Sequence, residues 1–463
     1  MMSRFDHDES RRAFLRRSAA LGVAGVATPF VTSLAGIGEA AAATATDYKA
    51  LVCVFLFGGN DYANTLTPYD AASYELYRTA RTNLAHARDA LAPTLLAPTV
   101  ALPGGRQYAL SPNMGSLASL FAAGKMAPIL NVGTLVQPTT KAQYSARSVP
   151  LPPKLFSHND QQSYFQASNP EGATSGWGGR LGDLLQSGNG QSTLTCINAS
   201  GNAVFLTGRS AVQYSVGSGG PVPLLNNGGT LFGSAAAGAT LRSLMTAPAS
   251  HMIANEHARV SKRSLDTYAS VAGALANAPA TGFPLFPAGN SLADQLKIVA
   301  RLISTSSELG AKRQVFFVSL GGFDLHDNLA AQHGTLLGRV SDAMKAFYDT
   351  TVALGVADKV TSFTASDFGR TLQSNDDGSD HGWGSMHFAV GGAVKGKRFY
   401  GTAPAIGNNT VDDVGQGRLL PTIAVDQYAA TLASWFGVAP GDLPTVLPNL
   451  GNYNPSSWNV GFV

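Results

Sequence analysis

Three apolar runs, each followed by small residues and an acid, most strongly constrain what this chain can fold into. They occupy residues 51–57 (LVCVFLF), 315–320 (VFFVSL) and 360–366 (VTSFTAS). The first run is continuously apolar, which is typical of a strand that is covered on both faces. Because helical segments alternate with these runs along the chain, the sequence predicts an α/β fold with a mainly parallel sheet and helices on both faces.

Two segments predict helices with some precision. Residues 291–310 are amphipathic, with Ser291 as the expected N-cap and Gly310 as the expected stop. Residues 252–276 also have helical periodicity. The wider region of about 137–290 is less regular and in places biased towards Gly, Ala and Ser, so we expect an irregular inserted region or lid there.

The composition limits the partners and the cysteine chemistry. Only 13% of the 463 residues are charged, the net charge is +3, and no basic stripe with interleaved aromatics occurs, so nucleic acid is not an expected partner. The two cysteines, Cys53 and Cys196, lie in apolar, strand-like contexts. An oxidising compartment permits a disulfide between them, and two buried free thiols are the alternative. Two cysteines cannot form a CxxC-type metal site.

The N-terminal segment predicts export. SRRAFLRR, residues 10–17, precedes an apolar run rich in Ala, Gly and Val and then the small-residue stretch EAAAATA. The pair Arg11–Arg12 resembles a twin-arginine signal, with a cleavage zone near Ala41–Ala43. We therefore expect residues 1–43 to be a signal peptide and residues 48–463 to form a periplasmic or secreted protein.

An uncleaved membrane anchor is the alternative for this segment. The apolar run is interrupted by Gly25, Pro29 and Gly36 and lacks the roughly 20 strongly apolar residues that a span needs. No other stretch of the sequence is long and apolar enough, so we expect no membrane span after removal of the signal.

Acids and histidines gather where the predicted strands end. Asp61 follows the first apolar run, Asp324 and His326 follow the second, and Asp367 follows the third. The loop after Asp367 adds Asp380 and His381. Because the carboxyl ends of parallel strands lie along one edge of a sheet, we expect these side chains to converge.

Converging carboxylates repel one another and lose solvation, which is costly unless a cation lies among them. Asp and His suit Zn, Mn, Mg or Ca, depending on the geometry. Asp324 and His326, two residues apart, present two ligands on the same side of an extended segment. The sequence therefore predicts a divalent metal site of one or two ions. Its expected ligands are Asp61, Asp324, His326, Asp367 and His381.

Each candidate also has a structural explanation. Asp61 and Asp367 could cap helices, and Asp324 with His326 could form a turn. Arg370 could bind an anionic substrate or brace the sheet edge. A solvated turn or a structural or surface position is the better explanation for Asp376, Asp377, His158, His333 and His387.

Seven motifs together resemble the exported bacterial family filed as domain of unknown function 1501. They are VFLFGGNDYANTLTPYD, LFSHNDQQ, GWGGRLGD, VSLGGFDLHDN, SDFGRT, GSDHGWGSMHFAVGG and VKGKRFYGTAP, and the resemblance covers about Tyr48 to the C-terminus. It implies a distant branch of the alkaline phosphatase, sulfatase and phosphopentomutase superfamily. This branch implies in turn a three-layer α/β/α sandwich, alkaline-phosphatase-like, with a binuclear metal site at the carboxyl edge of the strands. It implies no particular substrate.

The resemblance also implies roles for individual residues. Asp61 matches the first metal-binding Asp. Asp324 and His326 match the Asp and His of the first metal, although one residue separates them in place of a longer spacing. His381 matches the late His of that metal site.

One position departs from the implied pattern. Asp367 matches the Asp of the superfamily's DHG or DNG element, but its neighbour, usually a His, is Phe368 here. A phenyl ring cannot bind a metal. The departure leaves two possibilities: one ion, or a second ion held by Asp61, Asp367 and solvent.

For the nucleophile, the resemblance implies a Ser, Thr or modified Cys. Ser157 in FSHND, directly before His158, is the first candidate, and Thr65 is the second. A bound metal would lower the pKa of such a hydroxyl. No Cys lies in a Cys-x-Pro-x-Arg context, so a formylglycine sulfatase of the usual kind is not expected.

These observations favour an exported metal-dependent hydrolase of phosphate or sulfate esters, or of a related anionic substrate, either small or derived from a polymer. Ser157 or an activated water would attack, and Arg370 and Asn60 would orient the anion. The alternative is a non-catalytic exported protein that keeps the fold and serves in binding or envelope assembly. A polysaccharide-associated surface protein is a third possibility.

Overall fold

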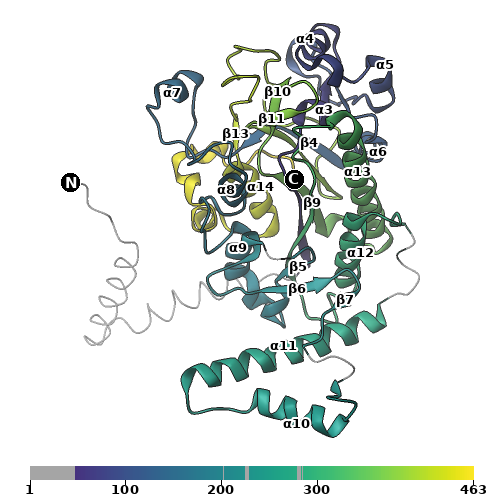
Figure 1. The fold of residues 1–463 in the computed structure, drawn as a ribbon, viewed down its shortest axis with the longest axis vertical. Helices are drawn as coiled ribbons and strands as arrows, with labels where there is room; N and C mark the ends of the chain where they lie inside the picture. The colour runs from purple at the N-terminus through teal and green to yellow at the C-terminus, as the bar shows by residue number, and fades with distance from the viewer. Residues whose placement is uncertain (1–46, 202, 225–228, 279–282, 284) are drawn as a thin grey trace, which may run out of the picture. The chain divides into compact units, whose positions relative to one another are not determined.

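A nine-stranded sheet forms the centre of the fold in the computed structural model, which describes residues 47–201, 203–224, 229–278, 283 and 285–463 (Figure 1). Its strands are β1 (Lys49–Leu56), β4 (Met126–Gly133), β5 (Cys196–Asn198), β6 (Gln213–Gly217), β7 (Gly220–Pro221), β8 (Arg313–Leu320), β9 (Val360–Ser366), β12 (Ser385–Gly391) and β13 (Ile423–Ala424). Their order is β13-β4-β12-β9-β1-β8-β5-β6-β7. Five of the eight pairings are parallel; β12 is antiparallel to both its neighbours, and β7 is antiparallel to β6.

The central strand β1 shows why the apolar run is continuous. Leu51, Cys53 and Phe55 join the apolar core on one face of the sheet, and Val52 and Val54 join the core on the other face. Because successive side chains of a strand point to opposite faces, a strand covered on both sides must be apolar at every position.

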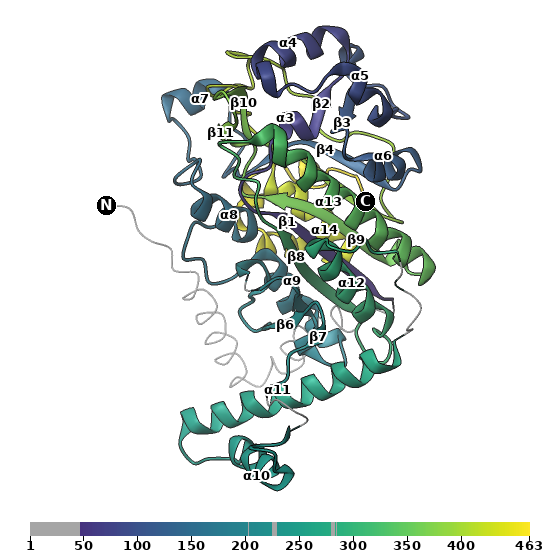
Figure 2. The same cartoon turned by 45° about the vertical axis from the view of Figure 1, so that its right-hand side comes forward.

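Helices cover the two faces of this sheet (Figures 1 and 2). The core that contains Val52 includes residues of α6 (Gly115–Ala122), α12 (Ser291–Ser304) and α13 (Leu329–Ala353). The core that contains Leu51 includes residues of α9 (Trp177–Leu185), α14 (Val425–Phe436) and α15 (Leu443–Val446). The prediction of a three-layer α/β/α sandwich with a mainly parallel sheet is therefore confirmed.

Smaller elements complete the fold around the carboxyl ends of the central strands and beyond. They are α3 (Tyr62–Thr65), β2 (Leu66–Pro68), α4 (Ala71–Arg81), α5 (Arg88–Leu91), β3 (Tyr108–Leu110), α7 (Lys141–Ala146), α8 (His158–Ala167), α10 (Ala235–Thr246), α11 (Met252–Asn277), β10 (Arg370–Ser374) and β11 (Ser379–His381). The helices α10 and α11 pack against each other and extend away from the sheet (Figure 2). Helix α11 confirms the helical periodicity predicted for residues 252–276.

Both predicted ends of the helix at 291–310 are wrong. Asn290 is the N-cap of α12, because its Oδ1 accepts the backbone N–H groups of Leu292 and Ala293. The helix ends at Ser304, six residues before Gly310. The hydroxyls of Ser304 and Thr305 donate to carbonyl oxygens of the last turn, which offers these carbonyls a partner other than a continuing helix.

Three sequence predictions concern the signal peptide, membrane-spanning helices and the two cysteines. The predicted signal peptide, residues 1–43, lies outside the described residues. In the part of the chain that the structure describes, no helix is both long enough and apolar enough to cross a bilayer. Cys53 on β1 and Cys196 on β5 are both buried free thiols, so the disulfide alternative is excluded.

A carboxylate is buried in the first turn of α14. Asp426 is 1% exposed and accepts a hydrogen bond from the Ser168 hydroxyl at 3.2 Å. Burial raises the pKa of Asp426 to about 6, although hydrogen bonds from Ser168 and Asn449 and the charge of Arg180 oppose that rise. Because the folded-state pKa exceeds the unfolded one, the ionised carboxylate destabilises the folded state above about pH 6.

We predict that Asp426→Asn removes a pH-dependent loss of stability. The contribution of Asp426 is fully favourable below its unfolded pKa and is lost as the pH rises through about 6. A shift of this size corresponds to about 3 kcal/mol between pH 4 and pH 7. Urea unfolding at pH 4 and pH 7 measures the free energy of unfolding. Relative to wild type, that of Asp426→Asn should rise by about this amount from pH 4 to pH 7. The exposed Asp442→Asn substitution is the control, and an equal change for both variants would contradict the prediction.

Candidate metal centre

The register of three strands brings their loops to one edge. Leu56 at the end of β1 pairs with Leu320 of β8 and with Ser366 of β9, so all three strands end on the same row of the sheet. Asp367 follows β9 directly, and Asp324 follows β8 after Gly321, Gly322 and Phe323. The short β10–β11 hairpin lies over the same edge (Figure 1).

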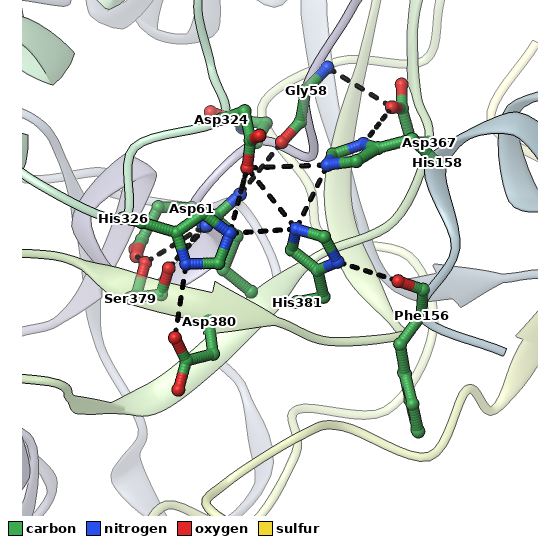
Figure 3. A network of polar contacts seen from close by, with 12 residues as sticks. Gly58, Asp61, Phe156, His158, Asp324, His326, Asp367, Ser379, Asp380 and His381 are labelled. Carbon is green, nitrogen blue, oxygen red and sulfur yellow. Dashed lines mark hydrogen bonds and ion pairs between the residues drawn. The ribbon is translucent and has the colours of Figure 1, made fainter.

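Three imidazoles and one carboxylate meet there (Figure 3). The Nε2 atom of His381 lies 3.0 Å from Nε2 of His158 and 2.9 Å from Nε2 of His326. Oδ1 of Asp324 lies 3.3, 3.2 and 3.3 Å from Nε2 of His158, His326 and His381, respectively. His158 and His326 lie on opposite sides of the Asp324–His381 pair.

The other nitrogen of each ring contacts an oxygen that can only accept. Nδ1 of His158 lies 2.6 Å from Oδ2 of Asp367, and Nδ1 of His381 lies 2.7 Å from the Phe156 carbonyl oxygen. Nδ1 of His326 lies 3.2 Å from Oδ1 of Asp380. Each Nδ1 therefore carries the proton that it donates, and each neutral ring leaves Nε2 as a bare lone pair.

Three lone pairs and a carboxylate oxygen at such separations repel one another unless a cation lies among them. A proton on one ring satisfies one of the two short Nε2–Nε2 contacts, but the other contact then needs a second charged imidazole beside the first. A divalent ion can satisfy His158, Asp324 and His381 together, because their ligand atoms all lie within 4.8 Å of one another. His326 contacts two of these ligands but lies outside the group. Ligand atoms around a tetrahedral ion with bonds of 2.0–2.1 Å are about 3.3 Å apart, which is close to the separations found here.

The electrostatic effects on the cluster differ among its members. Burial alone would raise the pKa of Asp324, but the Arg370 guanidinium, 2.9 Å from its Oδ1, holds the pKa below the ordinary value. The hydrogen bond to Asp367 raises the pKa of His158. Burial lowers the pKa of His381, which keeps this central ring neutral and its Nε2 able to bind a metal.

The cluster is open to solvent, whereas its supports are buried. The side chains of Asp324 and His326 are 46% and 41% exposed, so a ligand can reach them. Asp367 is 2% exposed and accepts the backbone N–H of Gly58 as well as the His158 proton. Its second oxygen, Oδ1, is buried and has no hydrogen-bond partner among the described residues.

An aromatic ring lies behind the imidazoles. The centroid of the Phe368 ring is 4.8 Å from that of His158 and 4.9 Å from that of His381. Gly59 gives this ring room, because a side chain at position 59 would collide with Phe368. The residue that replaces the implied metal-binding His thus fills the space beside two ligand rings.

Asp61 lies in a separate buried network. Its Oδ1 forms an ion pair with Arg81 and caps α3 through the N–H of Asn64, and its Oδ2 accepts the Ser379 hydroxyl at 2.7 Å. Burial would raise the pKa of Asp61, but Arg81 and His333 outweigh it and lower the pKa to about 2. The capping alternative for Asp61 is therefore observed, and both oxygens have partners other than a metal.

Two predicted catalytic residues, Ser157 and Asn60, form hydrogen bonds away from the His/Asp cluster. Ser157 is the N-cap residue of α8, and its hydroxyl donates to Asp160 at 3.0 Å. Asn60 is 2% exposed, and its side chain bonds to Thr65 and His333 within the core. In this arrangement the Asn60 amide does not reach the cluster.

Arg370 touches the cluster but has no free surface. It is 0% exposed and donates to the carbonyl oxygens of Gly58 and Ser379 as well as to Asp324. The structure thus favours the bracing role among the two alternatives for Arg370. Its charge acts on Asp324 rather than on a molecule in solvent.

Sequence reasoning misses two members of the site. It favours a structural or surface role for His158, although this residue directly follows the candidate nucleophile Ser157. In the fold, His158 lies at the sheet edge as the first residue of α8. Sequence reasoning leaves Asp380 out of the ligand set, and this residue holds His326. The available signal is the short HND segment after a Pro-bounded loop, which marks the start of a helix but not its position against the sheet.

These features define an α/β protein with a candidate mononuclear His/Asp metal centre at the carboxyl edge of its sheet. The family described as protein of unknown function (DUF1501) matches residues 48–427, so the chain belongs to this family. The resemblance in the sequence motifs is confirmed at this level. No curated protein matches the sequence.

Solved structures are similar only at a distance. The lipoteichoic acid synthase LtaP from Listeria monocytogenes is 10% identical, with a TM-score of 0.32 over 87% of this chain and 74% of that one. Ps i-CgsB, solved in complex with k-i-k-neocarrahexaose, is 10% identical, with a TM-score of 0.34; the match covers 89% of this chain and 78% of that one. A Bacteroides thetaiotaomicron protein from a glycosaminoglycan-metabolism locus is 11% identical, with a TM-score of 0.31; the match covers 84% of this chain and 73% of that one. Likenesses this low transfer neither a site nor a substrate.

We predict that His158→Ala and His381→Ala each abolish high-affinity binding of Zn²⁺, because each removes a bare nitrogen from the centre of the cluster. Calorimetric titration of metal-stripped protein measures the affinity. The control is His257→Ala, which removes an exposed imidazole on α11. Equal affinity in His158→Ala and His257→Ala would contradict the assignment of His158.

A second prediction concerns the supporting carboxylate. Asp367→Asn keeps the shape of the side chain but weakens acceptance of the His158 proton, so Zn²⁺ affinity should fall by about 10–100-fold. The matched control is Asp376→Asn, an exposed residue of the following turn. An unchanged affinity in Asp367→Asn would show that Asp367 does not orient His158 for a metal.

Proposed function

We propose that the protein is an exported, metal-dependent hydrolase of phosphate or sulfate esters or of a related anionic substrate. The convergence of three bare imidazole nitrogens on Asp324 is the observation that carries this proposal. We take His158, Asp324 and His381 as the residues that hold a single ion, with His326 next to Asp324 and His381. Export through the Arg11–Arg12 signal and a place in the superfamily of alkaline phosphatases and sulfatases belong to the same proposal.

A divalent ion in this site supplies Lewis acidity, which polarises an ester oxygen and activates a nucleophile. The chain supplies the orientation: Asp367, Asp380 and the Phe156 carbonyl fix the three rings through their Nδ1 protons. Arg370 holds Asp324 ionised, and the half-exposed Asp324 and His326 leave the site accessible.

Hydrolysis breaks the bond between the ester oxygen and phosphorus or sulfur. Water provides the new oxygen on the acid, and one of its protons passes to the leaving alcohol. Ser157 is the candidate for an intermediate covalent step, because its hydroxyl already donates to the Asp160 carboxylate, which can accept its proton. Direct attack by water is the other route to the same products.

A specific observation supports the alternative of a non-catalytic binding or envelope-assembly protein. Asn60 and Arg370, the two residues expected to orient an anion, are both buried in hydrogen bonds to the protein. A metal centre without an anion-orienting group suits a structural ion as well as a catalyst. Metal binding without turnover would therefore favour this alternative.

We predict that the metal-loaded protein hydrolyses 4-nitrophenyl phosphate or 4-nitrophenyl sulfate, and that chelation abolishes the activity. Asp324→Ala and His326→Ala should lower kcat/KM by about 10²–10³-fold, because several kcal/mol of charge stabilisation are lost. The release of 4-nitrophenol measures the rate with Zn, Mn, Mg or Ca. Activity that survives both substitutions would end the proposal.

The same assay separates the two nucleophiles. Ser157→Ala should abolish turnover but retain Zn²⁺ binding if the hydroxyl attacks, and should retain both if water attacks. Zn²⁺ affinity, measured in parallel, shows whether the variant still holds its metal centre.

A further inference from the structure

A cavity of about 300 Å³ lies between the end of β1 and helix α8. Residues Asn159, Gln162, Ser163 and Gln166 of α8 line it. Their spacing of three, four and seven residues places them on one face of the helix. Phe57, which directly follows β1, and Glu171 also line the cavity.

Two residues that line this cavity are next in sequence to residues of the candidate metal centre. Phe57 directly precedes Gly58, whose N–H binds Asp367, and Asn159 directly follows His158. Neighbouring residues are separated by about 3.8 Å between Cα atoms, so the cavity wall is one residue away from two members of the site. A substrate whose ester lies at the metal centre can place its remaining part in this cavity.

The lining is rich in uncharged groups that both donate and accept hydrogen bonds. The carboxamides of Asn159 and Gln162 have no hydrogen-bond partner in the part of the chain that the structure describes. Gln166 uses its Oε1 to accept the Phe205 N–H and keeps its amide protons. Ser163 donates to the Pro170 carbonyl and keeps its lone pairs. Such groups match hydroxyls, which also donate and accept.

The same lining disfavours a second anionic group. None of the residues that line the cavity is Lys, Arg or His, and Glu171 is the charged residue among them. A carboxylate accepts hydrogen bonds from hydroxyls but repels a phosphate or sulfate. The Phe57 ring adds an apolar surface suited to the C–H face of a sugar ring.

We propose that this cavity binds an uncharged, polyhydroxylated ring, so that the substrate is a phosphate or sulfate ester of a sugar, esterified at one position within the site. The assignment of the ester rests on the proposed function. The binding of the neutral ring rests on the cavity alone, so the two parts can fail separately.

The test is a titration of the metal-stripped protein with methyl glycosides of glucose, galactose and mannose, followed by saturation-transfer NMR. We expect saturable binding of at least one glycoside in the millimolar range. Gln162→Ala should weaken it by about tenfold, because one hydrogen bond to a hydroxyl is lost. The control is Gln332→Ala, an exposed glutamine on α13. Absence of saturable binding, or equal affinity in both variants, would overturn the proposal.

A kinetic comparison then tests the ester. With metal present, Gln162→Ala should lower kcat/KM for glucose 6-phosphate about tenfold more than for 4-nitrophenyl phosphate. Equal losses for both esters would overturn the assignment of the cavity to the sugar ring. Glycoside binding without hydrolysis of any ester would refute the proposed function and leave the neutral-ring site standing.

Discussion

The common end of β1, β8 and β9 is the constraint on which the site depends. Leu56 pairs with Leu320 on one side and Ser366 on the other, so three loops leave the sheet from one row. The distance of each acid from that row then decides its role. Asp367, one residue beyond this row, is buried and accepts the Nδ1 proton of His158. Asp324, four residues beyond it, lies in the exposed cluster beside Nε2 of His158. A shift of one residue in either pairing would move every side chain of one strand to the opposite face, and the acids would no longer meet at this edge.

Orientation of the imidazoles is the second requirement, and the backbone contributes directly to it. Phe156 has φ of +73°, a left-handed conformation that is uncommon for an aromatic residue, and its carbonyl accepts the Nδ1 proton of His381. Arg418 donates to the His381 carbonyl at 2.6 Å, and its guanidinium lies 5.1 Å from the Phe156 ring centroid. The central ring is therefore held from its side chain and from its backbone by one connected set of contacts.

The sheet was predictable from the sequence because burial on both faces leaves a continuous apolar run. The acids at its edge were predictable because parallel strands align their carboxyl ends. The partners of those acids were not, since Asp61 meets Arg81 from α4 and Asn60 meets His333 from α13, and neither pairing leaves a periodic pattern. His158 shows the same limit: its place depends on how a loop returns to the edge, which is a property of tertiary packing. For α12, the local competition between Asn290 and Ser291 for the N-cap was decided by the geometry of the Asn290 side chain.

The packing around the candidate ligands bears on the proposal of a single ion. A second ion beside the first would need donors near Asp367, and the adjacent space is filled by the Phe368 ring, packed on His158 and His381. Asp61, the other acid available in principle, has both oxygens engaged by Arg81, Asn64 and Ser379. Removing it from that network would leave the fully buried Arg81 guanidinium without its carboxylate partner, which is costly. Oδ1 of Asp367 has no hydrogen-bond partner among the described residues, but one oxygen does not make a metal site. The packing of the chain therefore supports a mononuclear centre, with the carboxylate at 367 acting through His158.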